Sequence, residues 1–483
     1  MVEQATLVNW VLWLTIASIP FFVIAWRCAW REQHRAALVW LVLAGALLRT
    51  GPALDPYLHV WDERYHALVA KHMMDEPLHP KLYSEHVLPY DRLSWTEGTD
   101  WYHKPPFPLW CMAASMKAFG VSEFSMRLPT LLASILGIWV CAGIISRYWG
   151  RRTAFVAAFL YGIQGSVIEI SSGRWATDHM DGMFTFLIGA SILVYLRSLQ
   201  RHRAAWLLLS GALLGCALLS KWLPALIVLP VNMLFAIGPH KRTWRSSLVD
   251  VLIIGAIATL ITAPWMLHVH QRFPDIAAHE SMMRYKHITE ALDGQSGGPF
   301  YYIDRIRVMF GELVYLPLIW FMMKAWAARR NWARWAFVVW AGGFIVFFSS
   351  AATKLHGYVL PIAIPTVGIT AMFWVTLERA VRGWKRARWA GLLVLVGLLA
   401  LPVRYCIERL KPLQDLTADM RTKERLIRSI GPGAPVVLNC PMPIEAMFYT
   451  DCIAYGGGAP EHVLDSLIRN GRRVVILEHP IVR

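Results

Sequence analysis

The sequence is poor in charge. Only 17% of its 483 residues are Asp, Glu, Lys or Arg, against about 25% in an ordinary soluble domain. The apolar residues come in blocks that approach the ~20 residues a helix needs to cross a hydrocarbon core. A soluble globular fold is therefore excluded. Because lipid cannot satisfy backbone polar groups, the blocks predict an all-α polytopic membrane protein.

We expect about twelve transmembrane helices. The N-terminal block lacks the basic segment and the small-residue cleavage site of a signal peptide, so we interpret it as a retained first span. The predicted spans are 9–26, 36–54, 126–146, 154–170, 180–196, 204–219, 222–238, 248–266, 304–323, 335–350, 358–377 and 389–404.

Acidic residues are fewer than basic ones, 32 against 48, which gives a formal net charge of +16. The basic residues do not form the single patch that nucleic acid requires, so no nucleic-acid partner is expected. They gather in every second connection, which indicates cytoplasmic loops by the positive-inside rule. Both termini, the loops 55–125 and 267–303 and the tail then lie outside, as in a bacterial inner-membrane protein. The basic connections contain Arg27, Arg31 and Arg35; Arg147, Arg151 and Arg152; Arg197, Arg201 and Arg203; Lys241, Arg242 and Arg245; Lys324, Arg329, Arg330 and Arg334; and Arg379, Arg382, Lys385, Arg386 and Arg388.

The seven cysteines show no CxxC spacing, which excludes zinc-finger architecture. Cys440 and Cys452 lie in the polar tail, where they form either a disulfide or two free thiols.

Two domains are predicted. Residues 1–404 form the transmembrane domain, whose outer loops 55–125 and 267–303 carry surface helices at 62–75 and 106–119. Residues 405–483 form a small extracytoplasmic α/β domain, with helices at 419–430 and 460–470 and strands at 434–439 and 473–477.

Pairs of carboxylates lie at the ends of two predicted helices, on the outer side of the membrane. Asp62 and Glu63 follow the second span, and a carboxylate there can act as general base on an acceptor hydroxyl. Asp178 and Asp181 open the fifth span and share a helix face. The alternatives are a solvated loop start for the first pair and helix capping for the second.

Basic residues remain on the outer side, where the positive-inside rule should deplete them. Two prolines follow Lys104 and restrict its backbone. Preplaced cations stabilise a phosphate leaving group, although each alone can simply extend toward lipid headgroups. The candidates for substrate or phosphate binding are Lys104, Arg127, Lys221, Arg284, Lys354 and Tyr358; a divalent metal is possible, with His103 and His287 as candidate ligands.

The ordered motifs WDERY (61–65), HKPPF (103–107), SEFSMRLP (122–129), LSKW (219–222) and KLHGYVLP (354–361) resemble the bacterial GT-C glycosyltransferases related to protein O-mannosyltransferases and to the lipid A aminoarabinose transferase. The resemblance covers about residues 36–378. It implies a polyprenyl-phosphate sugar donor, a lipid, glycan or protein acceptor, an active site on the outer face and usually inversion at the anomeric carbon. It also implies that Asp62 is the principal catalytic carboxylate, beside Glu63, and that Asp178 or Asp181 is the second acid.

The sequence departs from the family pattern. His103 stands where the aminoarabinose branch has Glu, Trp222 replaces a glycine, and His279-Glu280 replaces a Glu-His pair. A transporter or lipid flippase is an alternative function, but it predicts ionisable residues at mid-membrane depth. An O-antigen-ligase-like transferase is a second alternative, against which the early acidic pair argues.

Overall fold

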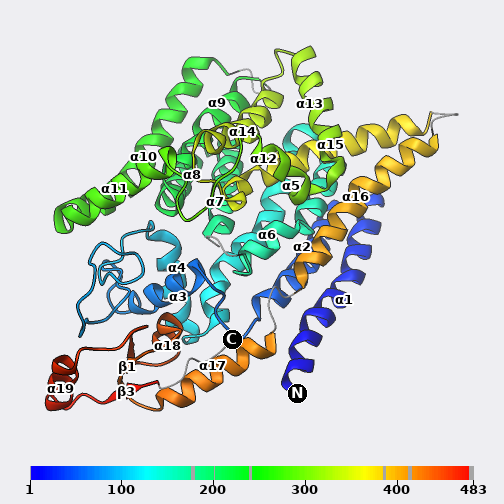
Figure 1. Cartoon of the computed structure of the whole chain (residues 1–483). Coiled ribbons are helices and arrows are strands. Elements are labelled where there is room, and N and C mark those ends of the chain that lie inside the picture. Colours follow the sequence, from blue (N-terminus) through cyan, green and yellow to red (C-terminus); the bar gives the residue numbers. More distant parts are fainter. Residues whose placement is uncertain are drawn as a thin grey trace.

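The computed structural model describes residues 2–175, 180–200, 202–238, 242–383, 388–411 and 416–477. A bundle of long helices makes up most of the molecule, and a smaller unit with three short strands lies at one end (Figure 1). The predicted all-α membrane fold with a small C-terminal α/β unit is confirmed.

The helices and strands in chain order are α1 (Val2–Trp30), α2 (His34–Ala53), α3 (Asp62–His72), α4 (Phe107–Phe119), α5 (Glu123–Gly162), α6 (Gly165–Ser171), α7 (Met180–Ser198), α8 (Arg203–Lys221), η1 (Leu223–Ile227), α9 (Val228–Ile237), α10 (Trp244–Arg272), α11 (Pro274–Thr289), α12 (Tyr301–Phe310), η2 (Glu312–Val314), α13 (Tyr315–Ala327), α14 (Trp332–Ser350), η3 (His356–Ile362), α15 (Ala363–Val381), α16 (Arg388–Leu410), α17 (Leu416–Ile430), β1 (Val436–Leu438), α18 (Pro443–Tyr449), β2 (Ile453–Ala454), α19 (Glu461–Arg469) and β3 (Val474–Ile476).

Within the described residues, nine helices are long and apolar enough to cross a membrane, or ten when one bent pair is counted as a single span. Two of the twelve predicted spans are not among these ten. One is the short apolar stretch Leu223–Ile237. The other is the second half of α5, which continues into α6.

The long helix α5 reverses direction at Gly150. This residue has φ 80° and ψ 168°, a conformation that costs glycine little because it has no Cβ. After the reversal the chain runs back along itself, so that the Tyr161 ring lies against Gly137. The predicted spans 126–146 and 154–170 are therefore an antiparallel pair.

The predicted continuous span 304–323 is wrong. The chain bends by 116° between the helices Tyr301–Phe310 and Glu312–Ala327. Gly311 between them has φ 90°, and a Cβ there would lie 2.9 Å from the Leu401 side chain. The bend thus depends on a glycine that the hydrophobic pattern alone does not distinguish from a helix interior.

Arg49 lies inside the predicted span 36–54. Arg49 of α2 is buried and donates to the carbonyls of Gly162 (2.6 Å) and Tyr161 (2.9 Å) and to the Ser134 hydroxyl (2.8 Å). The last carbonyls of a helix lack intrahelical partners, so Arg49 satisfies the end of α5. This charge has a structural explanation and does not indicate a transport path.

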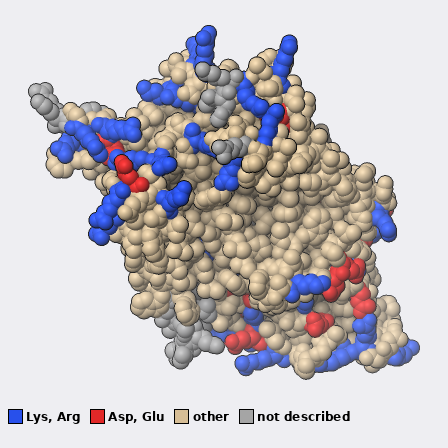
Figure 2. Space-filling model, turned by 180° about the vertical axis from the view of Figure 1, so that it is seen from behind, with Lys and Arg blue, Asp and Glu red and all other residues tan. Residues whose placement is uncertain are grey.

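The two ends of the bundle differ in charge. Figure 2 shows Lys and Arg gathered at one end with few acids among them, whereas the opposite end carries both signs. We call the first the basic end, where Figure 1 places the α13–α14 connection. The second is the mixed-charge end, which contains α3, α4 and the C-terminal unit. This separation is the one expected from the charge pattern.

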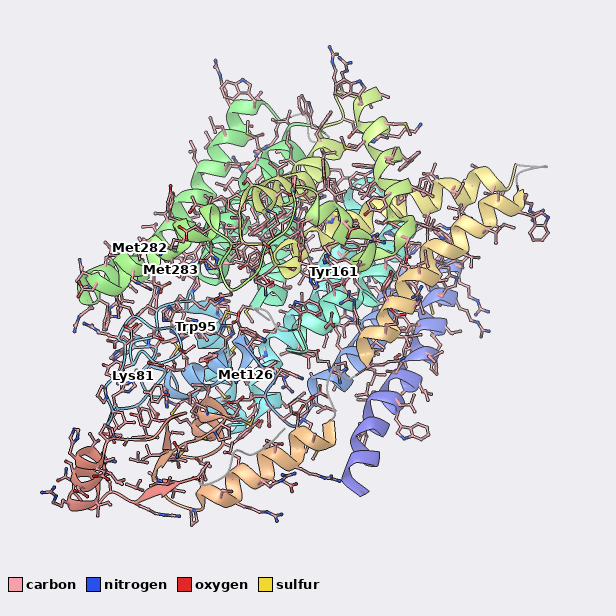
Figure 3. The ribbon with its side chains drawn as sticks, viewed as in Figure 1. Lys81, Trp95, Met126, Tyr161, Met282 and Met283 are labelled. Atoms are coloured by element: carbon pink, nitrogen blue, oxygen red, sulfur yellow. The ribbon has the colours of Figure 1, made fainter. Side chains whose placement is uncertain are left out.

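The C-terminal unit packs on the first outer loop. Its parallel strands have the order β2-β1-β3, and one hydrophobic core joins residues of both segments, including Leu68, Met112, Ile444 and Phe448. Lys71 of α3 donates to the Met447, Phe448 and Thr450 carbonyls at the end of α18. Figure 3 shows the loop with Lys81 and Trp95 between α11, which carries Met282 and Met283, and this unit. The predicted helices and strands of both segments are present; the division into two domains stays a prediction.

Candidate active site

Asp62 is the first residue of α3, where a negative charge is favoured by the helix dipole. The preceding residue, Trp61, has φ 68°, which is rare for a bulky side chain and requires support from its surroundings. The Lys104 ammonium lies 3.4 Å from the Asp62 carboxylate, and both side chains remain partly exposed. The two residues singled out from separate motifs therefore form one accessible ion pair.

Glu63, the neighbour of Asp62, is buried in a network of charges. Arg127 donates from Nε to its Oε1 (2.6 Å) and from an Nη to its Oε2 (3.1 Å). The backbone N–H of His59 donates to the same carboxylate at 2.6 Å. Burial by itself would raise the pKa of Glu63, but Arg127 and His59 outweigh it and hold the pKa well below its usual range. Glu63 therefore stays ionised, and its carboxylate is held in place next to Asp62 in the chain.

The remaining donors of Arg127 point to backbone. They contact the carbonyls of Ala53 (3.2 Å), Asp55 (2.5 Å) and Tyr57 (2.6 Å). The sequence suggested that Arg127 binds phosphate. Its full burial and these contacts favour a different role, in which it fixes the segment that leads into α3.

His59 connects this network to a second ion pair. Its ring lies between the carboxylates of Glu63 (2.5 Å) and Asp55 (3.2 Å). Burial opposes a charge on this ring, but the two carboxylates raise its pKa above the usual value. Arg174 donates to both oxygens of Asp55, at 2.7 and 2.8 Å, and with His59 it offsets burial and lowers the pKa of Asp55 to about 2. His59, Asp55 and Arg174 are not among the site residues expected from the sequence. The signal that could have indicated this network is the isolated Arg174 beside an apolar block.

A second group of polar residues joins the first outer loop to α11, and its acid, Glu280, is buried. Nδ1 of His103 is 2.5 Å from the Glu280 carboxylate. His287 contacts the Thr353 hydroxyl at 3.2 Å. Burial lowers the pKa of His287, and the charge of Lys104 lowers it further. The motif at 103–104 and the second outer loop therefore lie together, and Glu280 is a site residue that the sequence analysis noted only as a departure from the family.

The fifth span contributes a partly buried ion pair. Asp181, in the first turn of α7, is paired with the ammonium of Lys221 at the end of α8. The same ammonium lies 4.3 Å from the centre of the Tyr358 ring. The structure thus brings Asp181, Lys221 and Tyr358 together from three distant segments. Asp178 lies outside the described residues.

Trp222 ends α8 in a conformation that favours glycine, with φ 59°. Its ring lies beneath the Arg284 guanidinium at 4.8 Å, and Arg284 also donates to the Ser281 hydroxyl at 3.0 Å. Trp222 therefore positions the Arg284 guanidinium by contact with its ring.

Lys354 is placed differently from the other candidate cations. It is buried, and its ammonium donates to the carbonyls of Ser349 (3.0 Å) and Ala351. These oxygens stand at the end of α14, where a cation is favoured by the dipole and by the lack of intrahelical partners. This arrangement favours a structural role over the expected phosphate contact.

The candidate metal ligands each have another partner, Glu280 for His103 and Thr353 for His287. In the described part of the chain, no three His, Cys, Asp or Glu side chains converge as a metal site requires. Cys440 and Cys452 are both free thiols and buried.

The fold matches solved membrane proteins. ArnT from Cupriavidus metallidurans, in a crystal structure with undecaprenyl phosphate, superposes with a TM-score of 0.59 at 18% identity, over 93% of this chain and 90% of that one. The archaeal oligosaccharyltransferase AglB from Archaeoglobus fulgidus, in complex with a peptide and a dolichol-phosphate, gives 0.59 at 13% identity, over 86% and 64%. The chain therefore has the GT-C membrane fold.

Sequence comparison agrees with this class. A family model described as dolichyl-phosphate-mannose-protein mannosyltransferase matches residues 103–268. An undecaprenyl phosphate-alpha-4-amino-4-deoxy-L-arabinose arabinosyl transferase of Pseudomonas fluorescens is 27% identical over 351 residues, 69% of this chain and 58% of that protein. The transferase of the same description from Pseudomonas aeruginosa is also 27% identical over 351 residues, 67% and 57%. The chain thus spans less than two thirds of the length of these relatives.

Proposed function

We propose that the protein transfers a sugar from a polyprenyl-phosphate-linked donor to a lipid or glycan acceptor, with its site on the outer face of a bacterial inner membrane. The observation that carries the proposal is the accessible pair of Asp62 and Lys104, 3.4 Å apart, at the mixed-charge end of a GT-C fold. The names of the relatives, which specify undecaprenyl phosphate and aminoarabinose, support this donor class and make lipid A the first acceptor to test.

The reaction needs one proton acceptor and a stabilised leaving group. The acceptor oxygen forms a bond to the anomeric carbon while the bond from that carbon to the donor phosphate breaks. Asp62 takes the proton of the acceptor hydroxyl, and the polyprenyl phosphate leaves with the bonding electrons. Lys104, Lys221 and Arg284 offer positive charge to this phosphate, which is where charge develops.

The other acids have supporting roles in this proposal. Glu63 is buried and bound by Arg127 and His59, so it holds the start of α3 rather than contacting substrate. Asp181 orients Lys221, whose ammonium is also held by the Tyr358 ring. The proposal needs no metal.

The test replaces Asp62 by Asn, which keeps the shape and removes the base. In proteoliposomes supplied with an undecaprenyl-phosphate-linked aminosugar and lipid A, Asp62→Asn is expected to slow transfer by ~10²–10⁴-fold while donor binding is retained. Asp75→Asn is the matched control, because Asp75 lies in the same loop and is exposed. Wild-type turnover by Asp62→Asn would refute the assignment of the base. Loss of transfer by both variants would indicate a general effect on folding.

A further inference from the structure

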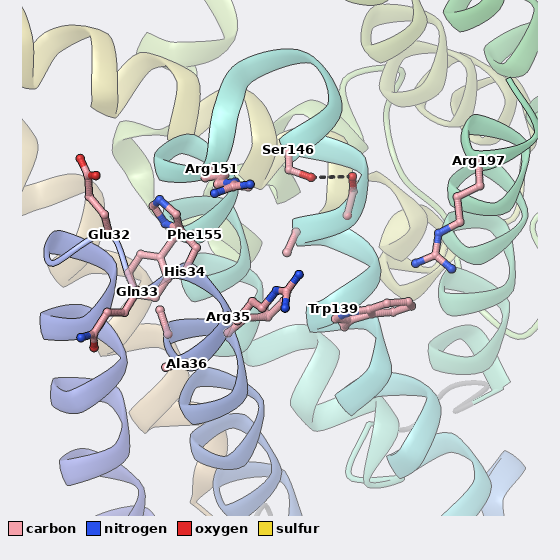
Figure 4. A pocket seen from close by; sticks show the side chains of 15 residues that line it. Glu32, Gln33, His34, Arg35, Ala36, Trp139, Ser146, Arg151, Phe155 and Arg197 are labelled. Carbon is pink, nitrogen blue, oxygen red and sulfur yellow. Dashed lines mark hydrogen bonds between the residues drawn. The ribbon is translucent and has the colours of Figure 1, made fainter. Parts of the chain in front are cut away.

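One cavity lies away from the candidate active site. It has a volume of about 830 Å³ and is formed by the start of α2 and both limbs of α5, with Arg197 from the end of α7. Figure 4 shows Arg35, Arg151 and Arg197 around this space, with Trp139 between Arg35 and Arg197. The reversal of α5 at Gly150 places Arg151 at its rim.

The three arginines of this cavity lack carboxylate partners. Among the described residues, no Asp or Glu oxygen lies within 4 Å of Arg35, Arg151 or Arg197. Glu32 is the one acid among the residues that line the cavity. The Arg197 guanidinium lies over two aromatic faces, the Trp139 ring at 4.9 Å and the Trp206 ring at 5.5 Å. Three cations without counterions around one space attract an anion with more than one negatively charged oxygen.

The cavity opens onto apolar surface. Its inner wall contains Leu38 and Phe155, and exposed apolar side chains continue along both helices below it. On α2 these are Val39 and Leu43, and on α5 they are Leu132 and Leu136. The exposed Trp139 is of the type that lies at the level of lipid headgroups. A ligand that fits this surface has an anionic head and a hydrocarbon tail.

We propose that this cavity binds the headgroup of an anionic phospholipid from the leaflet at the basic end. Basic pockets between membrane helices take such headgroups, because the anionic leaflet attracts each nearby Lys or Arg. The acyl chains lie along the exposed apolar residues of α2 and α5. This site is separate from the proposed transfer reaction, and its test does not use that activity.

The test measures lipid binding by the purified full-length chain in detergent, by native mass spectrometry. Phosphatidylglycerol is expected to remain bound, whereas phosphatidylcholine is not. Replacing Arg35, Arg151 and Arg197 together by Gln is expected to weaken phosphatidylglycerol binding on the order of 100-fold, since each arginine contributes about fivefold. Arg151→Gln alone gives about fivefold, which keeps the test valid if the triple variant does not fold.

Arg245→Gln is the matched control. Arg245 is exposed in the first turn of α10, at the basic end, and does not line the cavity, so its loss should leave binding unchanged. The proposal is overturned if phosphatidylcholine binds equally well or if Arg151→Gln and the triple variant bind phosphatidylglycerol as the wild type does. It is also overturned if inorganic phosphate displaces the lipid, because the cavity is then a site for free anions.

Discussion

Two groups of cations at opposite ends of this molecule differ in their partners. At the basic end, Arg35, Arg151 and Arg197 surround an open cavity and have no carboxylate partner among the residues that the structure describes. At the mixed-charge end, cations are held by acids: Arg127 by Glu63 and Lys104 by Asp62. Cations without a carboxylate partner can bind the anionic headgroups of the membrane, whereas paired cations are held in a fixed geometry by their acids. The difference concerns these two groups and not the ends as wholes, because Arg152 and Arg203 of the basic connections are paired with Glu378 and Asp250.

The largest expected effect concerns the buried pair. Arg127→Met leaves Glu63 and three backbone carbonyls without their donor, and breaking a buried ion pair from one side costs about 3–5 kcal/mol. The free energy of unfolding in detergent is the measurement. In the double variant with Glu63→Gln the loss should be smaller than the sum of the two single losses, because the partners share one interaction. Additive losses would contradict the buried network.

The next largest expected effect distinguishes the accessible Lys104 from the buried Lys354. Lys104→Gln is expected to weaken binding of a short-chain polyprenyl-phosphate analogue by ~10–100-fold, the value of one charge-assisted contact of ~1.5–3 kcal/mol. Lys354→Gln should lower stability and leave binding nearly unchanged, because Lys354 is buried at the end of α14. Lys117→Gln is the control, since Lys117 is exposed and donates to the Met74 carbonyl. If Lys354→Gln weakened binding as much as Lys104→Gln, the assignment of roles would be reversed.

The smallest effect is a pH dependence of stability at the mixed-charge end. The pKa of His59 is raised on folding, so its contribution is complete below its unfolded pKa of ~6.5 and is lost as the pH rises through the folded value. The pKa values of Glu63 and Asp55 are lowered, so their contributions are present above ~4.5 and are lost as the pH falls. The unfolding temperature should therefore be highest between these limits. His59→Gln should remove the decline above pH ~6.5, and a decline that persists would exclude His59 as its source.

Local features were read correctly from the sequence. Apolar blocks predicted most of the spans, and amphipathic stretches predicted α3 and α4. The pattern of the tail predicted α17, α19, β1 and β3. These predictions succeed because hydrophobic periodicity and turn residues determine structure over a few neighbouring positions. The prediction failed where one glycine decides the path. Gly311 bends a predicted span by 116°, and nothing in the composition of that segment separates it from a straight helix.

The sequence by itself determined that this is a polytopic membrane protein, which end carries the basic connections and which motifs carry ionisable groups. Those properties follow from the composition of short segments and from the cost of placing charge in lipid. The tertiary structure alone decided which charged side chains form buried ion pairs and which form accessible ones. Arg127 and Glu63 are 64 positions apart, and Lys104 and Asp62 are 42 apart. The sequence alone does not distinguish the surroundings of these two pairs. Folding buries Arg127 and Glu63 and leaves Lys104 and Asp62 accessible, because burial depends on packing between distant segments.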